Sequence, residues 1–265
     1  RSSFNTVRLG IYAAQKGLDV TGNNITNINT AGYTRQRLDQ VSLITSASDR
    51  YYSPYKTRVG QGVLTTGVSQ LRDPGLDIAY RNASADVGAA DAKLAGLEKL
   101  ASILDEVGKG DGEQDDGVLL NQLNDLRDLI NKAITSGLDS TQEGLIRASA
   151  KALCSLFNDA ADKLADMTET WETQLKDQVD TVNNILTSLR DLNISIRDAD
   201  IRGDAALELR DQRNLLLDQL SQYMDIDVKY EMEDVGAGLM VEKMTVTLGT
   251  GGKDKLVDGG FRSEE

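Results

Sequence analysis

A stretch of 58 residues, from Leu145 to Arg202, contains neither glycine nor proline, and it restricts the fold more than any other feature of the sequence. Because Gly and Pro are the residues that most often end helices, this interval predicts one continuous helix. At 1.5 Å per residue the helix would be on the order of 85 Å long. Its apolar residues alternate spacings of three and four, in the series Ile146, Ala150, Leu153, Phe157, Ala160, Leu164, Met167 and Trp171. The phase slips by one residue near Val179 and then resumes.

The surrounding region, residues 86–224, is free of proline and carries two shorter apolar periodicities and a last helix. Ser140 and Glu143 have the spacing of a capping box, which predicts Ser140 as the N-cap of the long helix. Gly203 is expected to end that helix, and Asp204 to cap the next one. This region therefore predicts a bundle of long helices with coiled-coil character.

The first thirty residues predict a separate amphipathic helix. Its apolar residues form a heptad seam without a miss: Phe4, Val7, Ile11, Ala14, Leu18, Thr21, Ile25 and Ile28. The opposite face carries Arg8, Lys16 and Asp19. A narrow seam on one helix cannot bury itself, so we expect at least one partner helix, and association with another helix more than ordinary core packing.

The seam ends in an asparagine-rich patch, NNITNINTAGYTRQ, at residues 23–36. On a helix, Asn23 and Asn27 lie one turn apart and Asn24 joins them, forming a stripe of amides that both donate and accept hydrogen bonds. Gly32 is free to adopt the positive φ of a helix stop. The pattern is compatible with contacts to neighbouring chains, and equally with an ordinary polar helix end followed by a turn.

Residues 225–265 change to strand-like alternation, in IDVKYEM and MTVTLG. The predicted fold class is mainly α: an elongated long-helix bundle, preceded by an amphipathic helix and an extended linker with short strands, and followed by the start of a β domain. The predicted divisions are residues 1–35, 36–85, 86–224 and 225–265. Because a two-stranded piece is only marginally stable alone, we expect the last region to be a truncated or much reduced outer domain.

Composition leaves little chemistry. The chain has no His and one Cys, which excludes a disulfide framework within the chain and leaves no plausible zinc site. Cys154 lies in KALCSLF and is expected to be a small buried hydrophobic residue. The glycine-rich GTGGKD lacks the first Gly and the final Ser or Thr of a phosphate-binding loop. The acidic segment 110–117 lacks the twelfth-position Glu of a calcium loop. We expect no catalytic residue, metal or cofactor.

Charge is unevenly distributed. Residues 1–81 carry ten Lys and Arg against five Asp and Glu, and the rest carries nineteen against thirty-seven, which together give the formal net charge of −13. An acidic body disfavours nucleic acid as a partner, because that affinity rests on phosphate neutralisation. The sequence contains no run of about 18 apolar residues, the length that a membrane-spanning helix needs, so membrane insertion is not expected. The first residues also lack the apolar core of a secretory signal peptide.

The patch resembles the N-terminal signature of bacterial flagellar axial proteins, the rod, hook and hook-associated proteins. The signature positions are Asn23, Asn24, Asn27, Thr30, Gly32 and Tyr33. The following Thr34-Arg35-Gln36 is most similar to the FlgK family of hook-associated proteins, which commonly has GYTRQ there. Thr26 and Ala31 replace a common Ala and a common Pro. The long helical block and LRDQRNLLLDQLSQYMDIDV at 209–228 extend the resemblance over residues 3–230.

This resemblance implies a structural protein of the extracellular flagellum, placed between hook and filament and exported without a cleaved signal peptide. It implies self-association in a helical tube, with the hook protein and the second hook-associated protein as further partners. The first helix would pair with a C-terminal helix, and an export chaperone would bind that C-terminal region; both lie outside this sequence. The implied assembly contacts are Phe4, Val7, Ile11, Ala14, Leu18 and Ile25 on the seam, with the signature positions beside them.

Two alternatives stay open. One is another flagellar axial subunit, such as a distal rod or hook protein. The other is a secreted enzyme on a helical scaffold, for which only the carboxylates of Asp234 and Glu242 are available in the β region.

Overall fold

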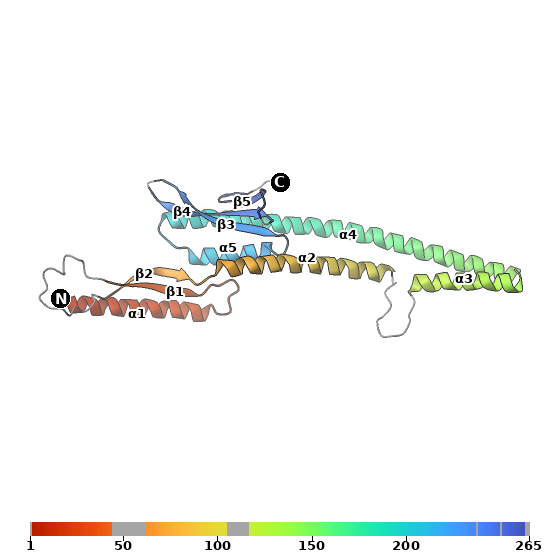
Figure 1. Ribbon diagram of the computed structural model, residues 1–265, viewed down its shortest axis with the longest axis horizontal. Coiled ribbons are helices and arrows are strands. Elements are labelled where there is room, and N and C mark those ends of the chain that lie inside the picture. Colours follow the sequence, from red (N-terminus) through yellow and green to blue (C-terminus); the bar gives the residue numbers. More distant parts are fainter. Residues whose placement is uncertain (1, 44–61, 105–116, 237, 250, 263–265) are drawn as a thin grey trace. The chain divides into compact units, whose positions relative to one another are not determined.

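A computed structural model describes residues 2–43, 62–104, 117–236, 238–249 and 251–262 (Figure 1). Within these ranges the chain is mainly α, as predicted. The helices are α1 (Ser2–Thr26), α2 (Pro74–Leu104), α3 (Val118–Ser136), α4 (Ser140–Ile201) and α5 (Leu207–Leu220). The strands are β1 (Gln36–Ser42), β2 (Val63–Gln70), β3 (Ile226–Asp234), β4 (Met240–Leu248), β5 (Lys255–Asp258) and β6 (Phe261–Arg262).

The chain forms two compact units. Unit 1 consists of residues 1–85 and 184–265, and unit 2 of residues 86–183. Helices α2 and α4 each pass from one unit into the other. Of the predicted bundle region, residues 86–183 belong to unit 2 and residues 184–224 to unit 1.

Helix α2 begins earlier than expected, inside the segment that was predicted to be an extended linker. Pro74 occupies the first helical position, where its missing N–H costs nothing. The carboxylate of Asp73 accepts hydrogen bonds from the backbone N–H of Gly75 at 2.8 Å and of Leu76 at 3.4 Å. Asp73 is thus the N-cap. The sequence Asp-Pro marks the start of a helix here and not a turn within a loop.

Helix α4 is the long helix predicted from the sequence, but its cap is one residue earlier than expected. Asp139 Oδ1 accepts the N–H of Gln142 at 2.7 Å, and Gln142 Oε1 accepts the N–H of Asp139 at 3.4 Å. This reciprocal pair is the capping box, so the prediction of Ser140 and Glu143 was wrong in register. Both choices satisfy the same spacing, and Asp is as good an N-cap as Ser. Glu143 instead forms an exposed ion pair with Arg147.

The turn between α4 and α5 also differs in detail. Gly203 has a φ of +79°, as expected for a residue that ends a helix. The residue before α5 is Ala206, not Asp204, and it adopts the left-handed region with a φ of 46°. Asp204 stabilises this turn from two residues away, because its Oδ1 accepts the N–H of Ala206 at 3.0 Å.

The N-terminal part of unit 1 is a helix packed on a hairpin. Strands β1 and β2 pair antiparallel, from Gln36 opposite Gln70 to Ser42 opposite Val63, with a bulge after Asp39. Helix α1 lies along this two-stranded sheet (Figure 1). The short strands expected between residues 36 and 85 therefore exist, and they cover one face of the first helix.

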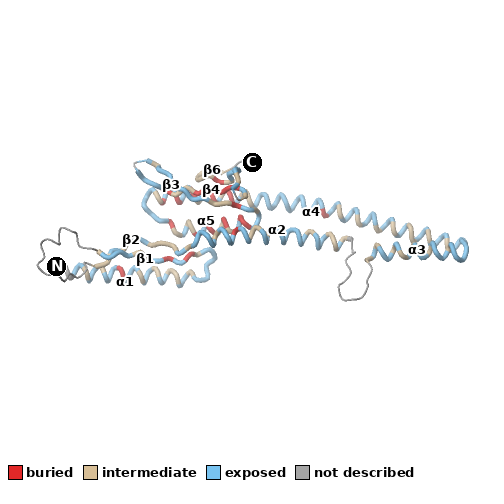
Figure 2. The backbone as a smooth tube through the Cα atoms, viewed as in Figure 1, coloured by how far each residue is buried: buried red, intermediate tan, exposed pale blue. Residues whose placement is uncertain are grey.

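The C-terminal part of unit 1 holds its core. Strands β3 to β6 form an antiparallel sheet in sequence order. The sheet is fastened to α4 by Asn193, which donates to the carbonyl of Gly259 at 2.9 Å, and to α5 through Arg213. Figure 2 shows buried positions gathered where α4, α5 and the sheet meet. Fully buried side chains there include Leu189, Ile196, Leu217, Leu220, Met244, Val246 and Val257.

Unit 2 has hardly any core. Helix α3 lies beside α4, and Gln122 donates to the hydroxyl of Ser149 at 2.9 Å (Figure 1). Among the described residues of 86–183, Met167 alone is buried. Cys154 is exposed, so the expectation that it is buried was wrong. It follows Leu153, and a step of one residue turns it about 100° away from the half-buried face. In the described parts of the chain, no helix is apolar over enough length to cross a bilayer.

Candidate assembly surface

Helix α1 has two apolar faces that point in different directions. The inward face packs on β1 and β2, with Ala13 buried and Leu9 and Val20 half-buried. The predicted heptad seam is rotated away from this face by roughly a third of a turn, as the 100° step per residue requires. The hairpin therefore does not cover the seam.

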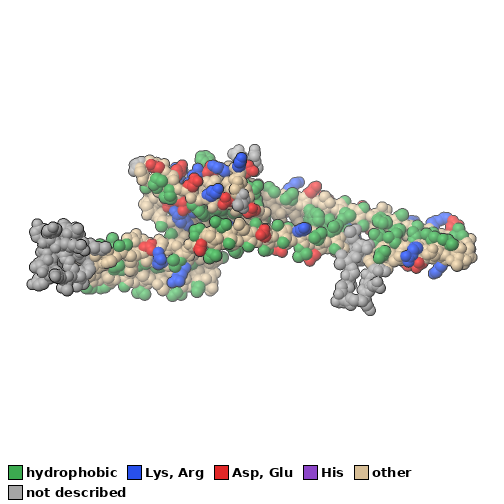
Figure 3. All heavy atoms as spheres, in the orientation of Figure 1, with side chains coloured by type: hydrophobic (Ala, Val, Ile, Leu, Met, Phe, Trp, Pro, Cys, Tyr) green, Lys and Arg blue, Asp and Glu red, His purple; other side chains and the backbone are tan. Residues whose placement is uncertain are grey.

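The seam is exposed along the helix. Phe4 is 75% exposed, Ile11 63% and Leu18 73%, although side chains of this kind are normally buried. The other predicted seam positions, Val7, Ala14 and Ile25, are exposed as well. Figure 3 shows apolar side chains along the visible edge of α1. Within the described residues nothing buries this row, and a contiguous apolar surface of this kind is typical of an interaction site.

The asparagine patch is built on a clamp between Asn24 and Gln36. Asn24 Oδ1 accepts the backbone N–H of Gln36 at 2.8 Å, and Asn24 Nδ2 donates to the Gln36 carbonyl at 2.9 Å. The side-chain amide of a helix residue thus satisfies both backbone groups of the first residue of β1. Gln36 is itself buried, at 7% exposure, so neither backbone group is free to bond to water instead.

The other polar signature side chains extend this clamp. Asn23 Nδ2 donates to the side chain of Gln36 at 3.3 Å. Asn27 Nδ2 donates to the carbonyl and side-chain oxygens of Asn23, at 3.0 and 2.9 Å. Thr30, which is exposed, donates to Asn27 Oδ1 at 3.2 Å. The predicted i, i+4 contact between Asn23 and Asn27 is therefore present, although α1 itself ends at Thr26.

The turn after the patch depends on Gly32 and Tyr33. Gly32 adopts the predicted positive φ, at +79°, and a Cβ there would lie 3.1 Å from the Cβ of Leu215. The hydroxyl of Tyr33 donates to Asn24 Oδ1 at 3.0 Å. Burial, and then the nearby carboxylates of Asp211 and Glu208, raise the pKa of Tyr33 above its usual value, so this donor stays protonated at neutral pH.

The amide stripe therefore acts within the chain. It binds the backbone of Gln36 at the start of β1, which belongs to the same chain. The roles of Asn23, Asn24, Asn27 and Tyr33 in contacts between subunits stay predictions.

Sequence reasoning missed the residues that attach this turn to α5. Asp211 Oδ2 accepts the backbone N–H of Thr34 at 3.0 Å, with both residues buried. Asp218 forms ion pairs with Arg81 at 2.9 Å and with Arg72 at 3.7 Å. A signal was available: the first 81 residues are net basic and the rest net acidic. In the structure, basic residues of the first segment pair with Asp218 of the acidic segment.

The carboxylates that an enzyme would need are already engaged. Glu242 forms ion pairs with Arg210, at 2.7 Å, and with Arg213. Asp234 accepts the N–H of Gly236 at 2.8 Å in the turn after β3. Within the described residues, no group of three acidic, His or Cys side chains could hold a metal ion. The calcium-loop candidate at 110–117 lies almost wholly outside these residues.

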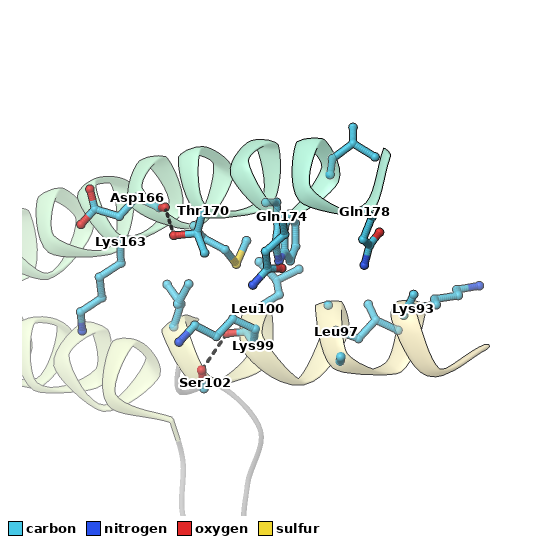
Figure 4. Close-up of a pocket in the computed structure, with 17 residues that line it drawn as sticks. Lys93, Leu97, Lys99, Leu100, Ser102, Lys163, Asp166, Thr170, Gln174 and Gln178 are labelled. Atoms are coloured by element: carbon cyan, nitrogen blue, oxygen red, sulfur yellow. Dashed lines mark hydrogen bonds between the residues drawn. The ribbon is translucent and has the colours of Figure 1, made fainter. Parts of the chain in front are cut away.

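Unit 2 contains an open groove of about 1220 Å³ between α2 and α4 (Figure 4). Trp171 lines this groove, and a Cβ on Gly96 of α2 would be in ordinary contact with its indole ring at 3.6 Å. Trp171 is still 41% exposed, so it anchors the two helices only in part. The groove is rimmed by polar and charged side chains, of which Figure 4 labels Lys93, Lys99, Lys163, Asp166, Thr170, Gln174 and Gln178.

Comparison with known proteins identifies two family models in the chain. The model described as the flagellar hook-associated protein FlgK helical domain matches residues 112–264. The model described as flagella basal body rod protein matches residues 5–34, which contain the seam and most of the asparagine patch.

Individual relatives agree with these models. The flagellar hook-associated protein 1 of Bacillus subtilis is 30% identical over 233 residues, which cover 86% of this chain and 44% of that protein. The protein of the same name from Escherichia coli is 23% identical, over 87% of this chain and 40% of its own length. The protein of the same name from Salmonella typhimurium is 24% identical, over 87% of this chain and 39% of its own length. The chain thus spans less than half the length of these relatives.

Proposed function

This chain belongs to the FlgK family of flagellar hook-associated proteins, and on that premise we propose that it is a structural subunit that joins hook to filament. The subunits would act by packing side by side into a helical tube. The observation that carries the proposal is the exposed seam of α1, an apolar surface that is regular, unpartnered within the described residues and carried by a helix packed on a hairpin.

The tube would be formed by α1 helices that bury their seams against other helices. The heptad spacing of the seam suits knobs-into-holes packing against a parallel or antiparallel partner. Burying a side chain such as Phe4, Ile11 or Leu18 is worth about 1.5–3 kcal/mol relative to leaving it exposed. Several such side chains on each subunit, repeated around a tube, would supply a large driving force for assembly.

The proposed partners follow from the place of such a subunit in the flagellum. They are further copies of the chain, the hook protein on one side and the second hook-associated protein on the other. The proposed location is extracellular, reached by export without a cleaved signal peptide. An export chaperone would bind a C-terminal region that lies outside this sequence. No nucleic acid and no membrane insertion form part of the proposal.

Complementation tests the proposal. Cells that lack the protein would receive the full-length protein carrying Ile11→Asp, which places a charge in the middle of the seam. The expected result is hooks without attached filaments and loss of swimming, while circular dichroism of the purified variant stays unchanged.

The matched control is Gln15→Asp. Gln15 is exposed on the polar side of α1 near Arg8 and Asp19, and the change brings the same new carboxylate into the same helix. This variant should swim normally. Normal filaments on cells that carry Ile11→Asp would refute the seam as the assembly surface.

A second candidate has one observation in its favour. The match of residues 5–34 to the basal body rod protein model fits a rod or hook subunit equally well. Purified hook–basal bodies from a strain that lacks the junction zone distinguish the two. A junction protein is missing from them, and a rod or hook subunit remains.

A further inference from the structure

One face of α5 contacts the turn in the asparagine patch at one end and the region around the start of α2 at the other. Asp211, Leu215 and Asp218 are spaced four and three residues apart, so they lie above one another on the helix. Asp211 accepts the N–H of Thr34, Leu215 lies against Gly32, and Asp218 pairs with Arg72 and Arg81. These three residues are called the α5 docking face below.

The opposite face of α5 belongs to the core. Leu217 and Leu220 are fully buried, and Arg213 donates hydrogen bonds to Asn193 on α4 and to Glu242 on β4. Helix α5 therefore connects the sheet and α4 on one side with the hairpin that carries α1 on the other.

The contact between the hairpin and α5 is mostly polar and directional. Gln70 Nε2 donates to the carbonyl of Leu207, at the start of α5, at 2.9 Å. Arg72, which pairs with Asp218 of α5, also donates to the hydroxyl of Thr34 at 3.3 Å within the N-terminal segment. Arg72 is itself fixed by Asp77 at 2.6 Å. Hydrogen bonds and ion pairs of this kind depend on angle as well as distance, so they determine an orientation more strictly than apolar contact does.

A shift of the hairpin relative to α5 would cost free energy, because charged side chains at this contact are buried. Asp211 is 7% exposed and Arg81 4%, and one polar atom of each, Asp211 Oδ1 and Arg81 Nη2, already has no hydrogen-bond partner in the described structure. Loss of the remaining partners would leave charges buried and uncompensated. The hairpin is thus favoured in one placement on α5 over others nearby.

We propose that Asp211, Leu215 and Asp218 are positioning residues that set the direction in which α1 presents its seam. Their effect on assembly runs through the turn at Gly32 and Thr34, which is the part of the asparagine patch between α1 and β1. This inference rests on the proposed function only in taking the seam as the assembly surface.

Distance measurement between α1 and α5 tests the proposal in the full-length protein. Spin labels would be placed at Gln15→Cys and Gln219→Cys, both exposed, in a background with Cys154→Ser. Electron–electron double resonance of the parent should give one narrow distance distribution. Asp211→Ala, which removes the acceptor for Thr34, should broaden that distribution about twofold or more.

Two further variants separate positioning from general damage. Asp211→Asn keeps an oxygen that can accept the N–H of Thr34, so it should restore the narrow distribution. Gly32→Ala changes no polar group but is strained at a φ of +79° and crowds Leu215, so it should broaden the distribution as Asp211→Ala does. Gln212→Ala, exposed on α5, is the matched control and should leave the distribution unchanged.

The outcomes keep the two proposals apart. A narrow, unshifted distribution in both Asp211→Ala and Gly32→Ala would overturn the positioning role, whatever the effect on motility. If Asp211→Ala loses its helical circular dichroism, the variant is unfolded and its distance distribution is not informative. The distribution of Gly32→Ala then decides whether the positioning role holds. Ile11→Asp should keep the parent distribution and still lose filaments, and filaments in that variant would refute the assembly surface without touching the positioning role.

Discussion

Asn24 and Gln36 are joined by two hydrogen bonds that copy the pairing of adjacent strands, with Asn24 Oδ1 accepting at 2.8 Å and Nδ2 donating at 2.9 Å. A side chain of α1 thereby takes the place of a strand beside the start of β1. The pair closes the turn between the helix and the hairpin.

Replacement of Asn24 by Asp should open this turn. The carboxylate keeps an acceptor for the N–H of Gln36 but loses the donor and faces the Gln36 carbonyl with oxygen. We expect a loss of about 1–3 kcal/mol in local stability, measured as faster amide hydrogen exchange across β1. Asn29→Asp, the same change at an exposed position, should stay within about 0.5 kcal/mol. Equal exchange in the two variants would contradict the clamp.

The cap of α4 gives a direct comparison between two adjacent residues. Asp139→Ala removes the acceptor for the Gln142 N–H and should lower the free energy of unfolding of this helix end by about 1 kcal/mol. Ser140→Ala should change it by less than about 0.5 kcal/mol. Thermal unfolding monitored by circular dichroism measures both. A larger loss of stability in Ser140→Ala than in Asp139→Ala would show that Ser140 is the N-cap, as predicted from the sequence.

Asp258 makes the C-terminal sheet sensitive to acid. Hydrogen bonds from Lys243 and then Lys255 lower its pKa from 3.8 to about 2. Because the folded pKa lies below the unfolded value, the stabilisation is complete above the unfolded pKa of 3.8 and is lost as the pH falls toward 2. The same contact with Asp258 raises the pKa of Lys243, so its contribution is lost only in strong alkali.

We therefore expect Asp258→Asn to destabilise unit 1 by about 1–2 kcal/mol at neutral pH, a value reduced for partial solvent screening. The difference from the parent should vanish near the folded pKa of about 2. Urea unfolding across the pH range measures it, with exposed Asp254→Asn as the control. A difference that does not depend on pH between 4 and 2 would count against the ion pair.

Glu242 balances two arginines, of which Arg213 is only 3% exposed. Glu242→Gln leaves that buried guanidinium without its countercharge and should cost about 3 kcal/mol in the free energy of unfolding. Glu231→Gln on the exposed part of β3 should cost less than about 0.5 kcal/mol. Chemical denaturation compares them. Similar midpoints would show that Arg210 and Arg213 find other partners.

Periodicity predicted the helices of this chain well, because apolar spacing and the absence of Gly and Pro are local properties. All but the last residue of the 58-residue interval lie in α4, and the alternating segments after Asp225 form β3 and β4. Errors arose where two adjacent residues satisfied the same rule, as at Asp139 and Ser140. The start of α2 was missed because Asp73-Pro74 was treated as a linker signal rather than as a cap and a first helical residue.

The candidate site was predictable only in part. Heptad spacing identified the seam, since it reflects one face of one helix. Gln36, Asp211 and Asp218 could not be found that way, because their partners are distant along the chain and depend on how the hairpin meets α5. The charge difference between the first 81 residues and the rest was the one sequence trace of that contact.

Because of the exposed apolar row on α1, self-association of the protein in solution should depend on the salt concentration. Copies with a formal net charge of −13 repel one another, and at 0.1 M salt this repulsion is largely screened beyond about 10 Å. Attraction between apolar surfaces is not weakened by such screening, and sulfate or phosphate strengthens it. Sedimentation should therefore detect larger species as sulfate is added, and Ile11→Asp should suppress them. The same apolar surface that we propose drives tube assembly would therefore favour aggregation of the purified protein, and the net negative charge would oppose that aggregation.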